Sequence, residues 1–188
     1  MTWWDVAVAE WMVERRTAVG DVVAHAFMAV GTRPVLMAAV GLLALGAAAL
    51  ARQFRLLLAL PVAAVGASVL GRLLKAVVDQ PRPPRALAVV EAAGSSMPSS
   101  AAMLTAAVAV AGYMCLDDLA PRARRLVGVV LAIGVATTGW SVVYLGAHWV
   151  TDVLVGWVLG AALGVGVGLV ARRVPIGRRL PDEADRPG

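Results

Sequence analysis

Long apolar stretches separated by short hydrophilic joints constrain the fold of this chain more than any other feature. Five of them approach the ~20 residues that a helix needs to cross a bilayer, and they cover about 34–51, 55–78, 98–116, 123–144 and 149–171. A weaker sixth candidate, 17–32, contains Asp21 and His25. None shows the alternation of a membrane β-strand. We therefore expect an all-α, polytopic membrane protein with a bundle of six transmembrane helices.

The composition agrees with a bundle that packs through small residues. Hydrophobic residues make up 60% of the chain, against ~45–50% in a typical soluble domain. The last stretch carries glycines at positions 156, 160, 164, 166 and 168. Cys115 is the only cysteine, which excludes a disulfide framework. The net charge of +5 comes from arginines in the joints, where membrane topology places them, so we expect no nucleic-acid partner.

The two ends of the chain differ from its middle. Residues 1–16 predict an amphipathic helix lying in the membrane interface, because apolar side chains recur there at helical spacing: Trp3, Trp4, Val8, Trp11 and Met12. Residues 17–171 then form the six-helix membrane domain. The Pro-rich and charged residues 172–188 predict a flexible cytoplasmic tail.

The arginines predict the orientation of the chain. With six membrane spans, the clusters at 15–16, 52–55, 122–125 and 172–179 fall on one side of the membrane. The positive-inside rule makes that side cytoplasmic, so both termini are expected there. The long loop 79–97 and the joint before the last stretch then face the extracytoplasmic side.

Chemically distinctive polar residues gather on this extracytoplasmic side, although they lie far apart in the sequence. Ionisable groups so close to the hydrocarbon are costly to place, and for that reason they are often functional. The set contains two cations, two serines at the start of a helix and a His–Asp pair: Lys75, Arg82, Ser99, Ser100, His148 and Asp152. Because a helix N-terminus also favours an anion, the set predicts a site of phosphate type.

The pair in "AHWVTDV" suits nucleophilic attack on phosphorus. His148 and Asp152 lie one helical turn apart, so the carboxylate can bind one ring nitrogen and leave the other free to attack. The pair alone is also typical of a structural hydrogen bond between packed helices. Similarly, Lys75 alone fits a side chain that reaches for the interface, and Ser99 alone fits a helix cap. Their convergence favours a site.

Three stretches in this region carry a family resemblance. "KAVVDQPRP" fits a K-x6-R-P motif, "MPSSAA" lies where P-S-G-H or P-S-S-H would follow, and "SVVYLGAHWVTD" lies where S-R-x5-H-x3-D would follow. In this order the motifs resemble those of the type 2 phosphatidic acid phosphatase superfamily, the membrane lipid phosphatases. The resemblance covers about residues 30–171.

The resemblance implies a role for each matching residue. Lys75 and Arg82 would bind the substrate phosphate, because the matching residues do so in the family, and Ser99 and Ser100 at the helix start are expected to bind it with them. His148 would be the nucleophile that forms a phosphohistidine, and Asp152 would orient it. The reaction would need neither a metal nor another cofactor.

Two positions depart from the family pattern. Ala101 stands where the family has the histidine that acts as general acid, and Val142 stands where it has a phosphate-binding arginine. Losing a positioned general acid typically costs ~10²–10⁴ in rate.

Three explanations fit these departures. Ala101 is an introduced inactivating change, which does not explain Val142. Alternatively, the native site has diverged, and other arginines serve in place of the lost groups: Arg33, Arg72 or Arg85. In the third explanation the chain is a catalytically inactive relative.

We therefore expect a lipid phosphatase in a bacterial plasma membrane, with a lipid phosphate as substrate and membrane lipids as its surroundings. Candidate substrates are polyprenyl phosphates and diphosphates, polyprenyl-phosphosugar phosphates, phosphatidylglycerol phosphate and phosphatidic acid. The Ala-, Val- and Arg-rich composition is typical of a high-GC bacterium and favours polyprenyl-linked cell-envelope lipids. The alternative is an inactive relative that binds a lipid phosphate or serves as a subunit of a homo-oligomer or membrane complex. A small transporter has little support, because paired broken helices are missing.

Overall fold

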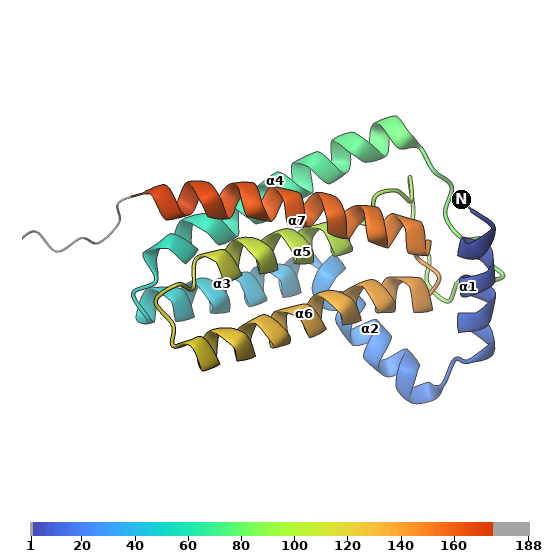
Figure 1. Ribbon diagram of the computed structural model, residues 1–188. Coiled ribbons are helices and arrows are strands. Elements are labelled where there is room, and N and C mark those ends of the chain that lie inside the picture. The colour runs from blue at the N-terminus through green and yellow to red at the C-terminus, as the bar shows by residue number, and fades with distance from the viewer. Residues whose placement is uncertain (1, 175–188) are drawn as a thin grey trace, which may run out of the picture.

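The computed structural model describes residues 2–174, and in that part the regular secondary structure is entirely α-helical (Figure 1). The helices are α1 (Trp3–Glu14), α2 (Ala18–Thr32), α3 (Pro34–Leu50), α4 (Phe54–Val78), α5 (Ser100–Met114), α6 (Pro121–Tyr144) and α7 (Val150–Arg173). Each begins and ends close to where the apolar pattern places it. Arg172 and Arg173, at the start of the predicted tail, belong to the last turn of α7. Residues 175–188 of that tail lie outside the described residues.

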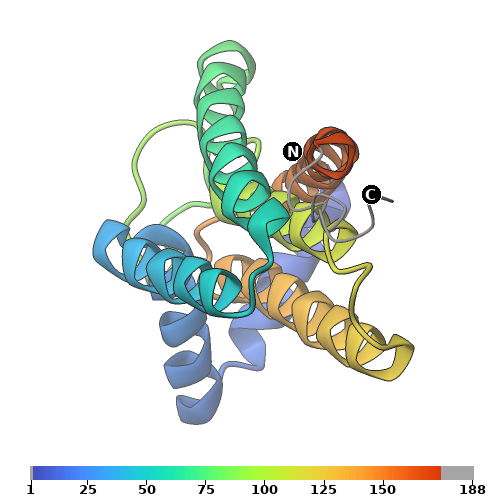
Figure 2. The same ribbon diagram turned by 90° about the vertical axis from the view of Figure 1, so that its left-hand side faces the viewer.

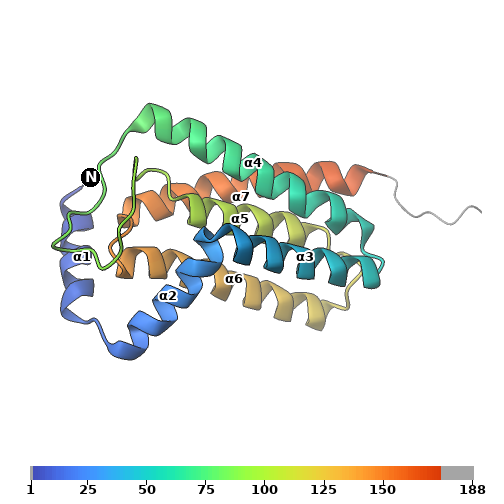
Figure 3. The same cartoon turned by 180° about the vertical axis from the view of Figure 1, so that it is seen from behind.

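The expected count of six spans is not confirmed. Within residues 2–174, only α4, α6 and α7 are long and apolar enough to cross a membrane alone, and α5 is a shorter apolar helix of 15 residues. Helices α2 and α3 together pass as a fourth span, but they meet at an angle of 77°. The break falls at Arg33, whose backbone is extended because Pro34 disfavours a helical residue before it. The two segments are therefore halves of one bent element (Figure 3).

Helix α1 and the end of α7 lie at opposite ends of the bundle (Figure 1). Helix α1 lies across the end of the bundle at which α7 begins, whereas α7 finishes at the other end (Figure 1). At that other end Asp117 binds both Arg124 and Arg172, at 3.2 and 3.0 Å. The expectation that both termini are cytoplasmic stays a prediction, because residues 175–188 lie outside the described residues. Arg15 and Arg16 lie at the opposite end from the other arginine clusters.

Helix α5 occupies the middle of the bundle, between α4, α6 and α7 (Figure 2). Its closest neighbour is α7, which turns a row of buried glycines toward it: Gly156, Gly160, Gly164 and Gly168. A Cβ atom on Gly164 would lie 2.6 Å from the Ala107 carbonyl oxygen, and one on Gly156 would lie 2.8 Å from that of Ser99. The two backbones are thus in direct contact, as in membrane bundles packed through small residues.

Candidate active site

The first turn of α7 holds the predicted pair at the end of the bundle near α1. Trp149 is the N-cap of α7, and its backbone N–H donates to the Asp152 carboxylate at 2.8 Å. This cap folds the carboxylate back over the turn, where Oδ2 lies 3.2 Å from His148 Nδ1. Asp152 is fully buried and His148 is 8% exposed. The structure therefore brings the two residues into contact in the way that their spacing predicts.

Two further side chains, which the sequence analysis missed, complete the surroundings of the Asp152 carboxylate. Gln80 donates from Nε2 to Oδ1 at 2.9 Å, and the buried hydroxyl of Ser96 donates to Oδ2. Gln80 lies inside the K-x6-R spacing, so its position offered a signal. Nothing in the sequence distinguishes Ser96 from the serines beside it. With donors on both oxygens, the carboxylate is fixed in place.

The two nitrogens of the His148 ring face different partners. Nδ1 faces Asp152, while Nε2 lies 3.4 Å from Arg82 Nη1. Since a carboxylate only accepts and a guanidinium only donates, these partners favour a neutral ring with its proton on Nδ1. Burial lowers the pKa of His148, the nearby charges of Arg82 and Lys75 lower it further, and Asp152 opposes the shift. Nε2 is therefore the ring nitrogen that carries the free lone pair.

The two predicted cations converge on one stretch of backbone. Lys75, in the last turn of α4, donates from Nζ to the carbonyl oxygens of Ser95 and Ser96 at 2.7 and 3.2 Å. Arg82 donates to the same Ser95 carbonyl at 3.3 Å and to that of Gly94 at 3.0 Å. Phosphoryl oxygens carry more negative charge than carbonyl oxygens, so they can compete for these donors.

The predicted serines lie at the start of α5. Ser99 is the N-cap, and its hydroxyl accepts from the backbone N–H of Ala102 at 3.5 Å. Its own N–H donates to the Asp152 carbonyl at 3.0 Å, which ties α5 to the first turn of α7. Ser100 is exposed and lies beside α4 at Gly71. Ser99 is thus used as a structural cap, while Ser100 keeps an accessible hydroxyl.

Ala101 and Val142 lie in one apolar cluster, where they are 4% and 1% exposed. Other buried members of this cluster are Ala102, Val143, Ala147 and Val153, and Met28 of α2 and Val90 pack against it. The two positions at which the sequence departs from the family pattern therefore hold side chains that pack within the same cluster.

None of the arginines considered as substitutes is among the groups that act on His148. Arg85 forms an exposed ion pair with Glu91 at 3.0 Å, and Arg72 is exposed and donates to the carbonyl of Ser68 at 3.2 Å. Arg33 is exposed at the break between α2 and α3. Among the described residues, the charged groups that act on His148 are Asp152, Arg82 and Lys75.

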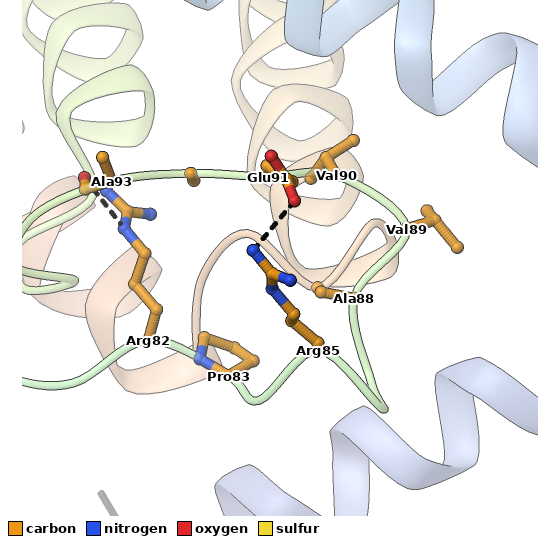
Figure 4. Close-up of a pocket in the computed structure, with 10 residues that line it drawn as sticks. Arg82, Pro83, Arg85, Ala88, Val89, Val90, Glu91 and Ala93 are labelled. Atoms are coloured by element: carbon orange, nitrogen blue, oxygen red, sulfur yellow. Dashed lines mark hydrogen bonds and ion pairs between the residues drawn. The ribbon is translucent and has the colours of Figure 1, made fainter.

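A pocket of about 480 Å³ opens beside the site, within the loop 82–93 (Figure 4). Arg82 forms one end of it, and the Arg85–Glu91 ion pair crosses it from one side of the loop to the other. The loop rests on the turn before His148, where the Val89 N–H donates to the Leu145 carbonyl at 3.0 Å. Gly146 permits this close approach, with φ of +73° and no space for a Cβ atom.

The segment that contains α1 makes contacts that hold the end of the bundle at which the site lies. The sequence did not reveal these contacts. Asp5 is fully buried and accepts hydrogen bonds from the N–H and the hydroxyl of Thr151, at 3.0 and 2.9 Å. Arg16 donates to the carbonyl oxygens of Tyr144 and Leu87, at 2.9 and 2.6 Å. Trp3 and Trp11 remain exposed, as expected of interfacial anchors.

Fold and site together define a multi-pass helical membrane protein of the lipid phosphatase type. The sequence signature of the PAP2 superfamily matches residues 55–174, which is more than half of the chain. The chain therefore belongs to the PAP2 superfamily. This confirms the resemblance seen in the three motifs.

Two solved structures are similar to this one. A transmembrane PAP2-type phosphatidylglycerolphosphate phosphatase from Bacillus subtilis has a TM-score of 0.80 and 25% sequence identity, over 93% of this chain and 87% of that one. Aquifex aeolicus LpxE has a TM-score of 0.69 and 22% identity, over 86% of this chain and 93% of that one. The second likeness is one of fold. No curated protein matches the sequence.

Proposed function

We propose that this chain hydrolyses a lipid phosphate through a phosphohistidine on His148. The position of the His148 ring carries the proposal, because Asp152 holds Nδ1 while Nε2 faces the cation Arg82. A neutral imidazole held in one tautomer is a competent nucleophile. A guanidinium beside the attacking nitrogen can hold the phosphoryl group in reach of it.

The reaction has two steps. In the first, the lone pair of His148 Nε2 forms a bond to phosphorus as the bond from phosphorus to the lipid oxygen breaks. The electron pair leaves with that oxygen, which takes a proton from solvent. In the second, water attacks the phosphohistidine, the Nε2–P bond breaks, inorganic phosphate leaves and a proton passes to solvent. Lys75 and Arg82 would bind the non-bridging oxygens throughout, with Ser100 at the start of α5 as a further donor. We propose that no metal takes part.

The substrate is proposed to be an anionic lipid whose phosphate reaches the membrane surface. The similar enzyme from Bacillus subtilis acts, by its name, on phosphatidylglycerol phosphate, which makes this lipid the first to test. Phosphatidic acid, polyprenyl phosphates and polyprenyl diphosphates complete the panel. A bacterial plasma membrane as the location also belongs to this proposal.

The orientation of the site is part of the proposal. Three arginine clusters lie at the end of the bundle away from His148, namely 52–55, 122–125 and 172–173. The positive-inside rule then makes that end cytoplasmic and the site extracytoplasmic. With α2 and α3 counted as one crossing, α1 lies on the extracytoplasmic side, together with the site.

Release of inorganic phosphate from this panel, by the full-length chain purified in detergent, tests the function. The decisive variant is His148→Ala, and His25→Ala is its matched control because His25 is the only other histidine. We expect activity that survives in His25→Ala and disappears in His148→Ala. Activity that persists in His148→Ala would exclude the proposed nucleophile.

The apolar cluster around Ala101 and Val142 supports a second candidate, an inactive relative that binds a lipid phosphate or serves in a membrane complex. This candidate predicts lipid binding without turnover. Turnover by the chain as it stands would exclude it. Turnover that appears only in Ala101→His would instead indicate an enzyme inactivated at that position.

A further inference from the structure

The end of the bundle away from His148 carries a group of polar side chains that the proposed reaction does not use. Asp117, in the joint after α5, forms ion pairs with Arg124 of α6 at 3.2 Å and with Arg172 of α7 at 3.0 Å. The Arg124 guanidinium also lies over the ring of Tyr113, 4.9 Å from its centroid. Tyr113, Asp117, Arg124 and Arg172 are called the Asp117 cluster below.

The Asp117 cluster has more donors and more positive charge than its carboxylate can satisfy. Each guanidinium has five N–H donors, and within residues 2–174 the buried Nε–H of Arg124 has no hydrogen-bond partner. In the described part of the chain, this end of the bundle carries two carboxylates, Asp117 and Asp118, against seven arginines: Arg52, Arg55, Arg122, Arg124, Arg125, Arg172 and Arg173. The cluster is therefore suited to an anion.

The position of the cluster favours an anion that belongs to a lipid. Helices α6 and α7 lie apart at this end, with the joint after α5 between them (Figures 1 and 2). Large apolar side chains are exposed on both helices within two turns of the paired arginines: Leu126 and Val129 on α6, Leu169 and Val170 on α7. A phospholipid contacts charged and apolar surface at the same time, whereas a soluble anion uses only the charges.

Two simpler roles account for only part of this arrangement. Arginines at this end satisfy the positive-inside rule, and cations near the last turn of α5 are favoured by its helix dipole. Neither role requires one carboxylate to tie the guanidiniums of two separate helices together. Neither one provides a partner for the buried Nε–H of Arg124.

We infer that the Asp117 cluster binds the head group of an anionic phospholipid, in the leaflet at the end of the bundle away from His148. Arg124 and Arg172 bind the non-bridging phosphate oxygens, since a guanidinium matches them in a bidentate way. Asp117 keeps the two guanidiniums together, and the acyl chains lie along the exposed apolar side chains of α6 and α7. The bound lipid is not a substrate, so this inference does not depend on the proposed function.

Binding can be measured with phosphatidylglycerol as the probe and phosphatidylcholine of the same acyl chains as the uncharged comparison. For the full-length chain in detergent, we expect native mass spectrometry to retain one phosphatidylglycerol. We also expect a saturable rise in Tm of about 5–10 °C at ~100 times the Kd. An equal rise with phosphatidylcholine, or with inorganic phosphate alone, would overturn the inference.

Two double variants separate the cluster from the general positive charge of this end. Arg124→Gln with Arg172→Gln removes both anion-binding side chains, so the affinity for phosphatidylglycerol should fall at least ~10-fold. Arg122→Gln with Arg173→Gln is the matched control, because it removes the same charge from exposed positions on the same two helices. We expect this control to bind as the unmodified chain does. Equal losses in the two double variants would show diffuse attraction and overturn the inference.

A milder variant keeps the question open to test if the first double variant does not fold. Arg124→Lys retains the positive charge beside Asp117 but cannot bind two phosphate oxygens at once, so it should still weaken phosphatidylglycerol binding. Unchanged binding in that variant would overturn the role of Arg124. Phosphate release in detergent without added phosphatidylglycerol should be the same in every folded variant. A failure of the proposed function at His148 would therefore be seen separately.

Discussion

The carboxylate of Asp5 caps a helix that begins 145 residues later, by accepting hydrogen bonds from the N–H of Thr151 at 3.0 Å and from its hydroxyl at 2.9 Å. Thr151 lies in the first turn of α7, between His148 and Asp152. The turn is therefore held from within by Asp152 and from outside by Asp5. Hydrogen bonds from Thr2 and Thr151 outweigh the effect of burial and lower the pKa of Asp5, so it stays charged.

Replacing Asp5 should impair the site without touching the substrate. Asp5→Ala removes the external cap, so we expect ~1–2 kcal/mol lower stability, as for the loss of a helix N-cap. We also expect a roughly 10–100-fold lower kcat with little change in KM, because groups that orient a catalytic residue have effects of about this size. Asp5→Asn keeps an acceptor for the Thr151 N–H, so it should recover most of the loss. Kinetics and thermal unfolding would measure both.

Glu10→Ala is the matched control for Asp5→Ala, because it removes an exposed carboxylate from the same helix. It should behave as the unmodified chain. If both alanine variants lose activity equally, or if Asp5→Ala raises KM alone, α1 does not position the first turn of α7.

The pH dependence of activity should reflect the buried state of His148. Its Nε2 must be neutral to attack, and burial lowers the pKa of this histidine. The neutral form therefore persists below about pH 6.5, the ordinary value for histidine. We expect the acid limb of kcat/KM to lie below that pH. Because unfolded His148 binds its proton at a higher pH than the folded residue, its contribution to stability is full above about pH 6.5 and falls with the pH.

Ring NMR gives a direct measurement of this pKa. In a His25→Gln background His148 is the only histidine, so its ¹⁵N signals report both protonation and tautomer. We expect a proton on Nδ1 at neutral pH and a midpoint below 6.5. A midpoint above that value would contradict the predicted direction.

Ser96→Ala should show how far the carboxylate depends on its neighbours. The hydroxyl donates to Asp152 Oδ2 in a fully buried position, and a hydrogen bond to a charged group is worth ~1.5–3 kcal/mol. We expect roughly tenfold lower kcat and lower thermal stability. Ser95→Ala is the control, since the Ser95 hydroxyl accepts from the Gln80 N–H at 3.1 Å and does not contact the carboxylate, while alanine retains the carbonyl oxygen that contacts Lys75 and Arg82. Equal losses in the two variants would argue against a specific role for the Ser96 hydroxyl.

Cysteine labelling can test the membrane orientation, because Cys115 is the only native cysteine. In a Cys115→Ser background, Glu10→Cys and Glu91→Cys should both react with an impermeant reagent added outside intact cells. Asp118→Cys, at the other end of the bundle, should react only after the membrane is opened. Labelling of Glu91→Cys without Glu10→Cys would restore the expected six spans.

Much of the fold could be predicted because α2 to α7 are apolar segments, and most of the joints between them carry charged residues or proline. The exception is the pair α2 and α3. Pro34 correctly predicts the start of a helix, but an extended residue before proline permits either a reversal of direction or a bend. Packing between the helices decides between a reversal and a bend. In this chain α2 packs with Gly31 close to Ala101 and Thr138. The number of crossings therefore could not be read from the sequence.

The site residues that belong to the sequence motifs could be predicted, namely Lys75, Arg82, His148 and Asp152. The supporting residues were not, because Asp5 and Ser96 act through contacts 146 and 56 positions away in the chain. Contacts between residues so far apart in the chain produce no repeating pattern in the sequence. The sequence showed Ala101 and Val142 as two separate departures from the family pattern. Only the structure shows that both side chains lie in one apolar cluster.

The glycine row of α7 determines where the bundle tolerates substitutions. Gly156 and Gly164 place the backbones of α5 and α7 in contact, so the separation of the two helix starts does not depend on how any side chain packs. The lipid-facing residues of α4 and α6 have no part in that contact. Substitutions there could match bilayers of different thickness, or another host, while the distance between Ser99 and Asp152 stays constant. The seam between α5 and α7 should therefore be the most rigid and the least replaceable part of the bundle.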